Sequence, residues 1–444
     1  MAGPLPPPAA GGPARASAYG WLVFALSFGL LISDYMARQV LGAVFPLLKA
    51  EWALSDSQLG LLSGIVAVMV GVLTFPLSLV ADRWGRVRSL TAMAVLWSLA
   101  TLLCAVAANF EQMLLGRALV GLGEAAYGSV GIAVVISVFP QRLRATLSSA
   151  FMAGGLFGQV LGVALGGQVA ASFGWRAAFA AIGLFGLVLG ALYPLLVRER
   201  RIATIAGHGG PDSQTRAALP WRALVASRSV RLAYVGSGLQ LFAAGAIPAW
   251  LPSFLGRYYA MPVDRAARGA AVLLLVCGLG MILCGMLSDR VARGRPERKI
   301  ALAIGYSLGT AVSLAAALQL PPGPAQLALL GAAMFLVAGT TGPAGAMVAN
   351  LTPLAVHGSA FATLTLANNL LGLAPGPILT GRAADSLGLL GAFQLLPIPC
   401  VLAAITFAAM RRSYLADLQR AAGNVALRPA ELLQLAQVAD DLLG

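Results

Sequence analysis

Four charged residues lie inside long apolar stretches of this sequence. Asp34 and Arg38 are four residues apart in one stretch, and Arg117 and Glu124 are seven apart in another. Both spacings place the two side chains on one face of a helix. A charge near the centre of a lipid bilayer costs about 2.5–3.5 kcal/mol even on lenient scales, so such residues face a cavity or one another. The quartet therefore predicts a polar site inside a membrane protein.

Two interpretations of this quartet remain open. It is either a permanent ion-pair network that fixes how two helices pack, or a site where a carboxylate changes its partner or its protonation during function. The second requires only that burial favours a neutral acid while a nearby guanidinium favours the carboxylate. At about 1.5 Å per residue, Asp34 and Glu124 fall at one depth and the two arginines at another. We favour the second interpretation.

Other polar residues in the apolar stretches carry weaker signals. Gln240, Asn368 and Asn369 lie in the second half of the chain, where they could line a cavity. Each alone could equally make a hydrogen bond between helices. The four cysteines and two histidines show no metal-ligand spacing, so we expect neither a metal nor a cofactor.

Composition restricts the class of protein. Of 444 residues, 59% are hydrophobic and only 10% are charged, whereas soluble globular proteins carry about 25% charged residues. So little charge cannot cover a water-soluble particle, which excludes a cytosolic enzyme or a secreted domain. The net charge of +14 comes from basic residues between apolar stretches. It indicates membrane topology, and no nucleic-acid partner is expected.

The chain contains twelve apolar stretches long enough to span a membrane as helices of about 20 residues. We therefore predict an all-α membrane protein with twelve transmembrane helices in two pseudo-symmetric six-helix bundles. The predicted spans are 20–45, 57–80, 88–108, 111–138, 145–171, 177–197, 230–256, 267–288, 299–320, 324–350, 358–381 and 389–410.

The two halves of the chain repeat each other. The segment from Gly166 to Gly174 after the fifth span resembles the segment from Gly381 to Gly388 after the eleventh. Asp-Arg pairs also recur after the second and eighth spans, and this recurrence predicts a structural gate rather than a solvated loop. The expected gate residues are Asp82, Arg83, Arg86, Asp289 and Arg290.

The repeat divides the chain into five segments. We expect a disordered cytoplasmic tail at 1–19, bundles at 20–197 and 230–410, a cytoplasmic central loop at 198–229, and a cytoplasmic tail with an amphipathic helix at 411–444. With the amino terminus inside, 22 basic residues lie in inner segments and 6 in outer ones. Because inner loops carry the excess of Lys and Arg, both termini are predicted to be cytoplasmic.

These features resemble the major facilitator superfamily along nearly the whole chain. The resemblance rests on twelve spans, the repeated Asp-Arg loops and Arg117-x-x-x-Gly121-x-x-x-Ala125. The segments Asp34 to Pro46, Leu54 to Leu61 and Gly121 to Tyr127 are similar to bacterial spinster-like transporters. This likeness implies alternating access and adds Tyr127 to the expected site. One position departs from the family, because Ala37 stands where the family has Asp before the Arg of the first span.

The resemblance implies a secondary active transporter of a small or amphipathic organic molecule, anionic or lipid-like, coupled to protons. We expect Arg38 and Arg117 to bind or gate an anionic group, Glu124 to titrate, and Asp34 to be its partner. The protein is expected to act as a monomer in a bacterial inner membrane. The alternatives are an organic-anion importer of the same superfamily and, from another class, a non-transporting receptor or an intramembrane enzyme. No HExxH motif, Ser–Lys pair or Asp pair in the spans supports the enzyme.

Overall fold

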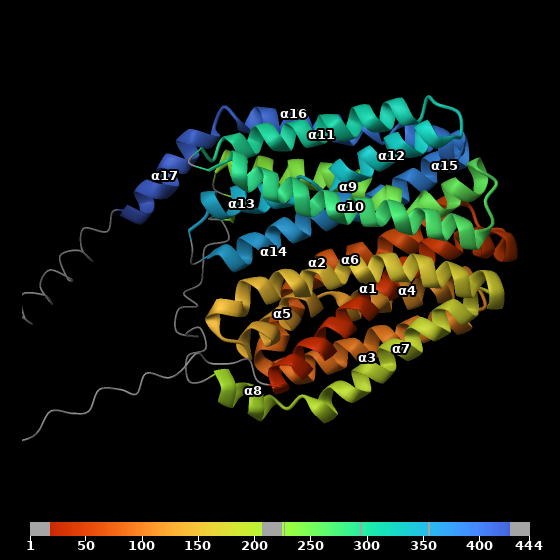
Figure 1. Ribbon diagram of the computed structural model, residues 1–444, viewed down its shortest axis with the longest axis horizontal. Coiled ribbons are helices and arrows are strands. Elements are labelled where there is room, and N and C mark those ends of the chain that lie inside the picture. The colour runs from red at the N-terminus through yellow and green to blue at the C-terminus, as the bar shows by residue number, and fades with distance from the viewer. Residues whose placement is uncertain (1–17, 207–223, 226, 294, 354–355, 427–444) are drawn as a thin grey trace, which may run out of the picture.

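Two bundles of helices make up the protein. The computed structural model describes residues 18–206, 224–225, 227–293, 295–353 and 356–426, and within them it contains helices and no strand. Figure 1 shows the first bundle, from α1 to α8, lying beside the second, from α9 to α17. The predicted fold class is confirmed.

The first bundle covers the first six predicted spans. Its helices are α1 (Ala18–Trp52), α2 (Asp56–Trp84), α3 (Arg86–Val106), α4 (Phe110–Glu124), α5 (Tyr127–Ser137), α6 (Gln141–Phe173), α7 (Trp175–Leu196) and α8 (Glu199–Ala206). The second bundle contains α9 (Arg228–Tyr258), α10 (Val263–Val291), α11 (Arg298–Ala317), α12 (Pro324–Val337), α13 (Thr341–Leu351), α14 (His357–Asn368), the π-helix η4 (Asn369–Leu373), α15 (Pro375–Gln394), α16 (Pro397–Met410) and α17 (Tyr414–Ala426).

Within the described residues, ten helical stretches are each long and apolar enough to cross a membrane. The remaining segment, from His357 to Met410, contains a turn at Gly388, which has φ 72° and ψ 164°. Gly174 has nearly the same conformation, φ 84° and ψ 163°, where the chain turns between α6 and α7. Because this left-handed region favours glycine, the two glycines mark equivalent turns of the repeat. The segment after α13 thus supplies the last two crossings.

The spans predicted at 111–138 and 324–350 are present as Phe110–Ser137 and Pro324–Leu351, but each contains a break that the sequence analysis did not predict. The first stretch breaks between α4 and α5, directly after Glu124, and the second breaks between α12 and α13. In a membrane, backbone groups freed by a break need partners inside the protein. Thr74 Oγ1 donates to the carbonyl of Ala125 at 2.7 Å, and Gln240 Nε2 donates to that of Val337 at 3.1 Å. Each break is therefore stabilised by a side chain from the same bundle.

We call the side of the molecule with the start of α1 and the end of α7 the terminal side, and the opposite one the far side. Short helices follow the last span of each bundle on the terminal side (Figure 1). Glu199 of α8 accepts hydrogen bonds from the backbone N–H groups of Arg86 (3.0 Å) and Val87 (2.8 Å). Asp417 of α17 likewise accepts one from Ser229 (3.0 Å). Both acids cap the start of a span, where unpaired N–H groups favour negative charge.

The segments outside the spans differ in part from their predicted form. Ala18 and Tyr19, which the sequence places in the amino-terminal tail, already belong to α1, and residues 1–17 lie outside the described part. The predicted central loop contains α8. Its residues 207–223 and 226 are not described. The predicted helix of the tail corresponds to α17, beyond which the description ends.

On the far side, the two bundles meet through close backbone contacts. A Cβ atom added to Gly60 of α2 would lie 2.5 Å from the carbonyl oxygen of Pro377, and one on Gly42 of α1 would lie 2.8 Å from that of Ala249. Beside them, the rings of Phe45 and Trp250 lie 4.9 Å apart. Only glycine allows helices to approach this closely.

The turn at Gly388 generates a prediction about stability. Gly388→Ala should lower the free energy of unfolding by about 1–2 kcal/mol, because an L-residue is strained at positive φ while open space surrounds the site. Gly358→Ala is the matched control, since Gly358 also has open space and is helical. Denaturant unfolding in mixed micelles measures both. Equal stability of the two variants would contradict the assigned turn.

Candidate functional site

An ion pair between α1 and α4 lies at the centre of the first bundle. Arg38 donates from Nε (3.0 Å) and Nη2 (2.7 Å) to Oε2 of Glu124. The side chain of Glu124 is fully buried, and that of Arg38 is 22% exposed. Glu124 is also the last residue of α4 before the break. The carboxylate thus sits where a span is interrupted, and its cationic partner keeps some contact with open space.

Arg117 does not pair with a carboxylate. Its Nη1 and Nη2 donate to the backbone carbonyls of Ala37 (2.7 Å) and Arg38 (3.0 Å), and its Nε donates to that of Leu62 (3.4 Å). The residue is 1% exposed. One guanidinium therefore ties α4 to the backbones of α1 and α2, directly at the residue that binds Glu124.

Asp34 completes the quartet without a cation of its own. It is 4% exposed and lies one helical turn before Arg38 on α1. Among the described residues, Asp34 Oδ1 and Glu124 Oε1 are buried and accept no hydrogen bond. A buried acceptor without a donor is unfavourable. The site can therefore take up a proton or a donor group at these oxygens, and an anion could compete with Glu124 for Arg38.

The other expected site residues lie around this centre or away from it. Tyr127 is buried, and its hydroxyl donates to the carbonyl of Ser27 on α1 at 2.7 Å. Gln240 is fully buried inside the second bundle, where it bonds Thr310 as well as Val337. Both residues join helices within one bundle.

Asn368 and Asn369 lie where span eleven changes from α14 to the π-helix η4. Asn369 Nδ2 donates to the carbonyl of Thr365 at 2.9 Å. Within the described residues, the side-chain oxygens of both asparagines are buried and have no partner. A Cβ atom on Gly71 of α2 would meet Asn369 at 2.9 Å, which places Asn369 at the contact between the bundles. π-Helical turns are frequent at functional sites.

The expected gate residues lie on the terminal side without forming one cluster. Arg83 and Arg290 are exposed at the ends of α2 and α10. Asp289 forms an ion pair with Lys299 at 2.9 Å inside the second bundle. Arg86 starts α3, where Glu199 caps its backbone. The side chain of Asp82 lies outside the described part.

The sequence analysis missed a group of polar contacts across the bundles on the far side, which we call the far-side latch (Lys49, Asp56, Ser57, Arg257 and Asp385). Asp56 accepts two hydrogen bonds of 2.7 Å from Arg257 and one of 2.6 Å from Lys49. Asp385 accepts hydrogen bonds from the backbone N–H groups of Asp56 (2.7 Å) and Ser57 (3.0 Å), and from the Ser57 hydroxyl. An acid of the second bundle thus caps a helix of the first.

One sequence signal could have indicated the latch. Ser55 and Gln58 form a capping box at the start of α2, a pattern that is readable from sequence. It marks a helix start with further N–H groups to satisfy. It does not indicate that Asp385, 329 residues away from Asp56 in the chain, would bind them.

Comparison with known proteins identifies relatives along most of the chain. The family model described as Major Facilitator Superfamily matches residues 26–342. The sphingosine-1-phosphate transporter SPNS2 of Danio rerio is 26% identical over 437 residues, covering 90% of this chain and 85% of the relative. The gallate transporter of Pseudomonas putida is 27% identical over 325 residues, covering 66% of this chain and 70% of the relative.

A solved structure shares the fold. A bacterial homologue of the human lysosomal transporter Spinster, in an inward-facing and unoccupied conformation, superposes with a TM-score of 0.79. The sequence identity is 21%, and the match covers 91% of this chain and 99% of the other. At this identity the likeness concerns the fold alone.

The contacts of Arg117 generate a prediction about stability. Arg117→Lys should lower the free energy of unfolding by about 2 kcal/mol or more, because a single ammonium cannot reach all three carbonyls and buried acceptors lose their donors. The exposed Arg88→Lys is the control and should stay within about 0.5 kcal/mol of the parent protein. Denaturant unfolding in mixed micelles compares them. A stable Arg117→Lys variant would show that the carbonyl contacts contribute little.

Proposed function

This chain belongs to the Major Facilitator Superfamily, and on that premise we propose that it is a secondary active transporter of a small or amphipathic organic anion, coupled to protons. It is a multi-pass membrane transporter and not an enzyme. The observation that carries the proposal is the Arg38–Glu124 ion pair, beside which Asp34 Oδ1 and Glu124 Oε1 are buried without a donor from the described residues.

Competition for Arg38 would couple the anion to the proton. In this structure, Arg38 neutralises Glu124. An anionic group that binds Arg38 takes this partner away, and a buried carboxylate without a cation favours binding a proton. Asp34 lies one turn away and offers a second carboxylate, in place of the family acid absent at Ala37. Arg117 positions Arg38 through the carbonyls that it binds.

Alternating access is supported by the closure of the far side. On the far side, the latch and the glycine contacts close the path between the bundles. We propose that the termini are cytoplasmic, that the membrane is a bacterial inner membrane and that the protein acts as a monomer. The structure then corresponds to an inward-facing state. Asp82, Arg83, Arg86, Asp289 and Arg290 would take part in closing the terminal side in the other state.

The second candidate within transport is an organic-anion importer. The similarity to the gallate transporter of Pseudomonas putida supports an organic anion as its substrate, since gallate is an aromatic carboxylate. A lipid-like anion as the substrate is favoured by the similarity to the sphingosine-1-phosphate transporter. The two candidates use the same site and differ in the direction in which substrate and protons move.

Proton coupling predicts that pH shifts the conformational equilibrium through Glu124. Spin labels at Arg88 and Arg298 report on the terminal side, and labels at Phe173 and Pro322 report on the far side, all four positions being exposed. In nanodiscs, the distance distributions of the parent protein should change between about pH 5 and pH 8, and Glu124→Gln should remove most of this change.

Glu111→Gln is the matched control, because Glu111 is an exposed acid at the start of the same helix. It should leave the pH dependence as in the parent protein. Distances that do not respond to pH in the parent protein, or that respond equally in Glu124→Gln, would contradict the proton-coupled mechanism.

The far-side latch predicts a second shift of the same equilibrium. Asp385→Asn removes the charge that caps α2 across the bundles. Charge-assisted hydrogen bonds contribute about 1.5–3 kcal/mol, so the population open on the far side should rise about tenfold or more. The labels at Phe173 and Pro322 measure this population. Asp264→Asn, which removes a far-side acid paired within its own helix, should leave it unchanged.

A further inference from the structure

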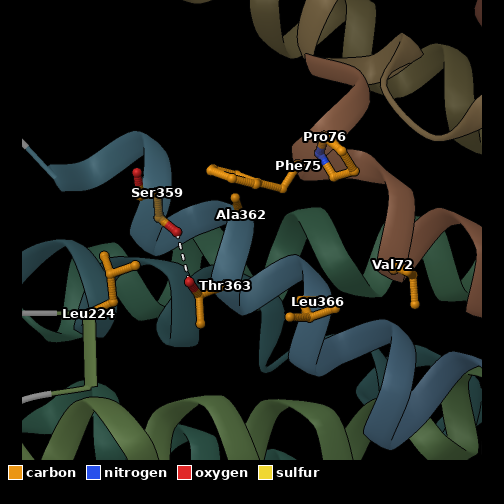
Figure 2. A pocket seen from close by; sticks show the side chains of 9 residues that line it. Val72, Phe75, Pro76, Leu224, Ser359, Ala362, Thr363 and Leu366 are labelled. Carbon is orange, nitrogen blue, oxygen red and sulfur yellow. Dashed lines mark hydrogen bonds between the residues drawn. The ribbon is translucent and has the colours of Figure 1, made fainter. Parts of the chain in front are cut away.

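A recess of about 420 Å³ lies between α2 and α14, at the boundary of the two bundles. Figure 2 shows Val72, Phe75 and Pro76 on one wall and Ala362, Thr363 and Leu366 on the other. The volume is within the range of about 300–1,000 Å³ that is usual for small-molecule sites. The recess is separate from the quartet of charged residues.

The lining of the recess is suited to hydrocarbon. Val72 and Phe75 are 53% and 54% exposed, so their apolar surface is available to a ligand. The Thr363 hydroxyl already donates to the carbonyl of Ser359 at 2.9 Å, which uses its proton within α14 (Figure 2). No charged residue lines the recess among the residues that the structure describes. It therefore favours an apolar group over a polar one.

The recess begins where the contact between the bundles ends. Along α2, Gly60 and Gly64 pack against α15, and Gly71 packs against Asn369. Three of the next five residues, Val72, Phe75 and Pro76, line the recess on the way to the terminal side. The diverging helices thus leave a space that is closed toward the far side.

The recess and the ion pair lie at the same depth. Thr74, which lies on α2 between the lining residues Val72 and Phe75, donates to the carbonyl of Ala125 at 2.7 Å, and Ala125 directly follows Glu124. The α2 wall therefore stands beside the end of α4 that carries the carboxylate. A charged site and an apolar site on neighbouring helices at one depth match a molecule with an anionic head and a hydrocarbon tail.

We propose that the recess between α2 and α14 holds the hydrocarbon part of the transported anion while its charged head binds Arg38. The proposal rests on the proposed function and extends it, because it makes the length of the apolar tail a determinant of specificity. The recess contributes affinity in proportion to the apolar surface that it removes from water. Arg38 supplies the selection for negative charge.

The test uses a series of straight-chain carboxylates, from butanoate to dodecanoate, with dodecyltrimethylammonium as the cationic counterpart. Binding to the full chain in phosphatidylcholine nanodiscs is measured by isothermal titration calorimetry, with empty nanodiscs as the blank. We expect affinity to rise about fourfold per added methylene. Dodecanoate should bind at least tenfold more tightly than dodecyltrimethylammonium.

Variants that fill the recess decide where the tail lies. Ala362→Trp should flatten the dependence on chain length and leave butanoate binding unchanged, because only long tails reach the recess. Phe361→Trp is the matched control, since Phe361 is the neighbouring residue on α14, is 42% exposed and does not line the recess. Leu366→Trp fills the recess from a second, partly exposed position. It provides the same test if Ala362→Trp does not fold.

The outcomes separate the two proposals. A preference for the anionic head together with a chain-length dependence unchanged by both filling variants would overturn the tail site and leave the proposed function standing. A chain-length dependence that the filling variants remove, without preference for the anion, would overturn the anionic substrate and the joint site. Identical behaviour of Phe361→Trp and Ala362→Trp would mean that the tail binds through the surrounding lipid, which also overturns the tail site.

Discussion

The ion pair between Arg38 and Glu124 lies in the membrane-spanning part of the first bundle, where a lone charge would be unstable. Several features of that bundle serve to keep the pair in place. Arg117 donates hydrogen bonds to the backbone carbonyls of Ala37 and Arg38. The position of the Arg38 guanidinium is therefore set by α4 as well as by α1. α4 ends at Glu124, and Thr74 satisfies the carbonyl that the break exposes. The packing of α1, α2 and α4 thus follows from the requirement that two opposite charges remain together in a low dielectric.

The second bundle repeats the architecture without the charge. The tenth span, in the second bundle, is broken as the fourth span is in the first. Gln240 donates to the carbonyl of Val337 at this break, as Thr74 donates to that of Ala125 at the other. Gln240 is neutral and fully buried, so the repeat preserves the broken span but not the ion pair. This asymmetry supports a division of labour in which only the first bundle binds the charged group.

Periodic and compositional features were predictable from the sequence, whereas contacts between distant segments were not. Apolar length indicated the spans, and the sequence repeat that ends at Gly174 and Gly388 corresponds to equivalent turns in the structure. The sequence also singled out the buried quartet, but spacing along one helix cannot tell which carboxylate Arg38 contacts, because the choice depends on how α1 and α4 cross. The contacts of Arg117 were also unpredictable, because its acceptors are backbone carbonyls, which every residue possesses. In the sequence, Asp56 and Asp385 resemble ordinary solvated residues at the ends of spans. Their contacts across the bundles are visible only in the structure.

The glycine contacts on the far side have a consequence for the speed of conformational switching. Where Gly60 and Gly42 face carbonyl groups of the other bundle, no side chain from these positions inserts into the opposite surface. Smooth backbone surfaces can separate without rotamer changes or the withdrawal of interlocked side chains, and they can meet again in the same register. The polar rim around them must also part, and there a few charges exchange protein partners for water. Glycine at these positions would therefore act on kinetics, allowing a tight seal that nevertheless opens quickly.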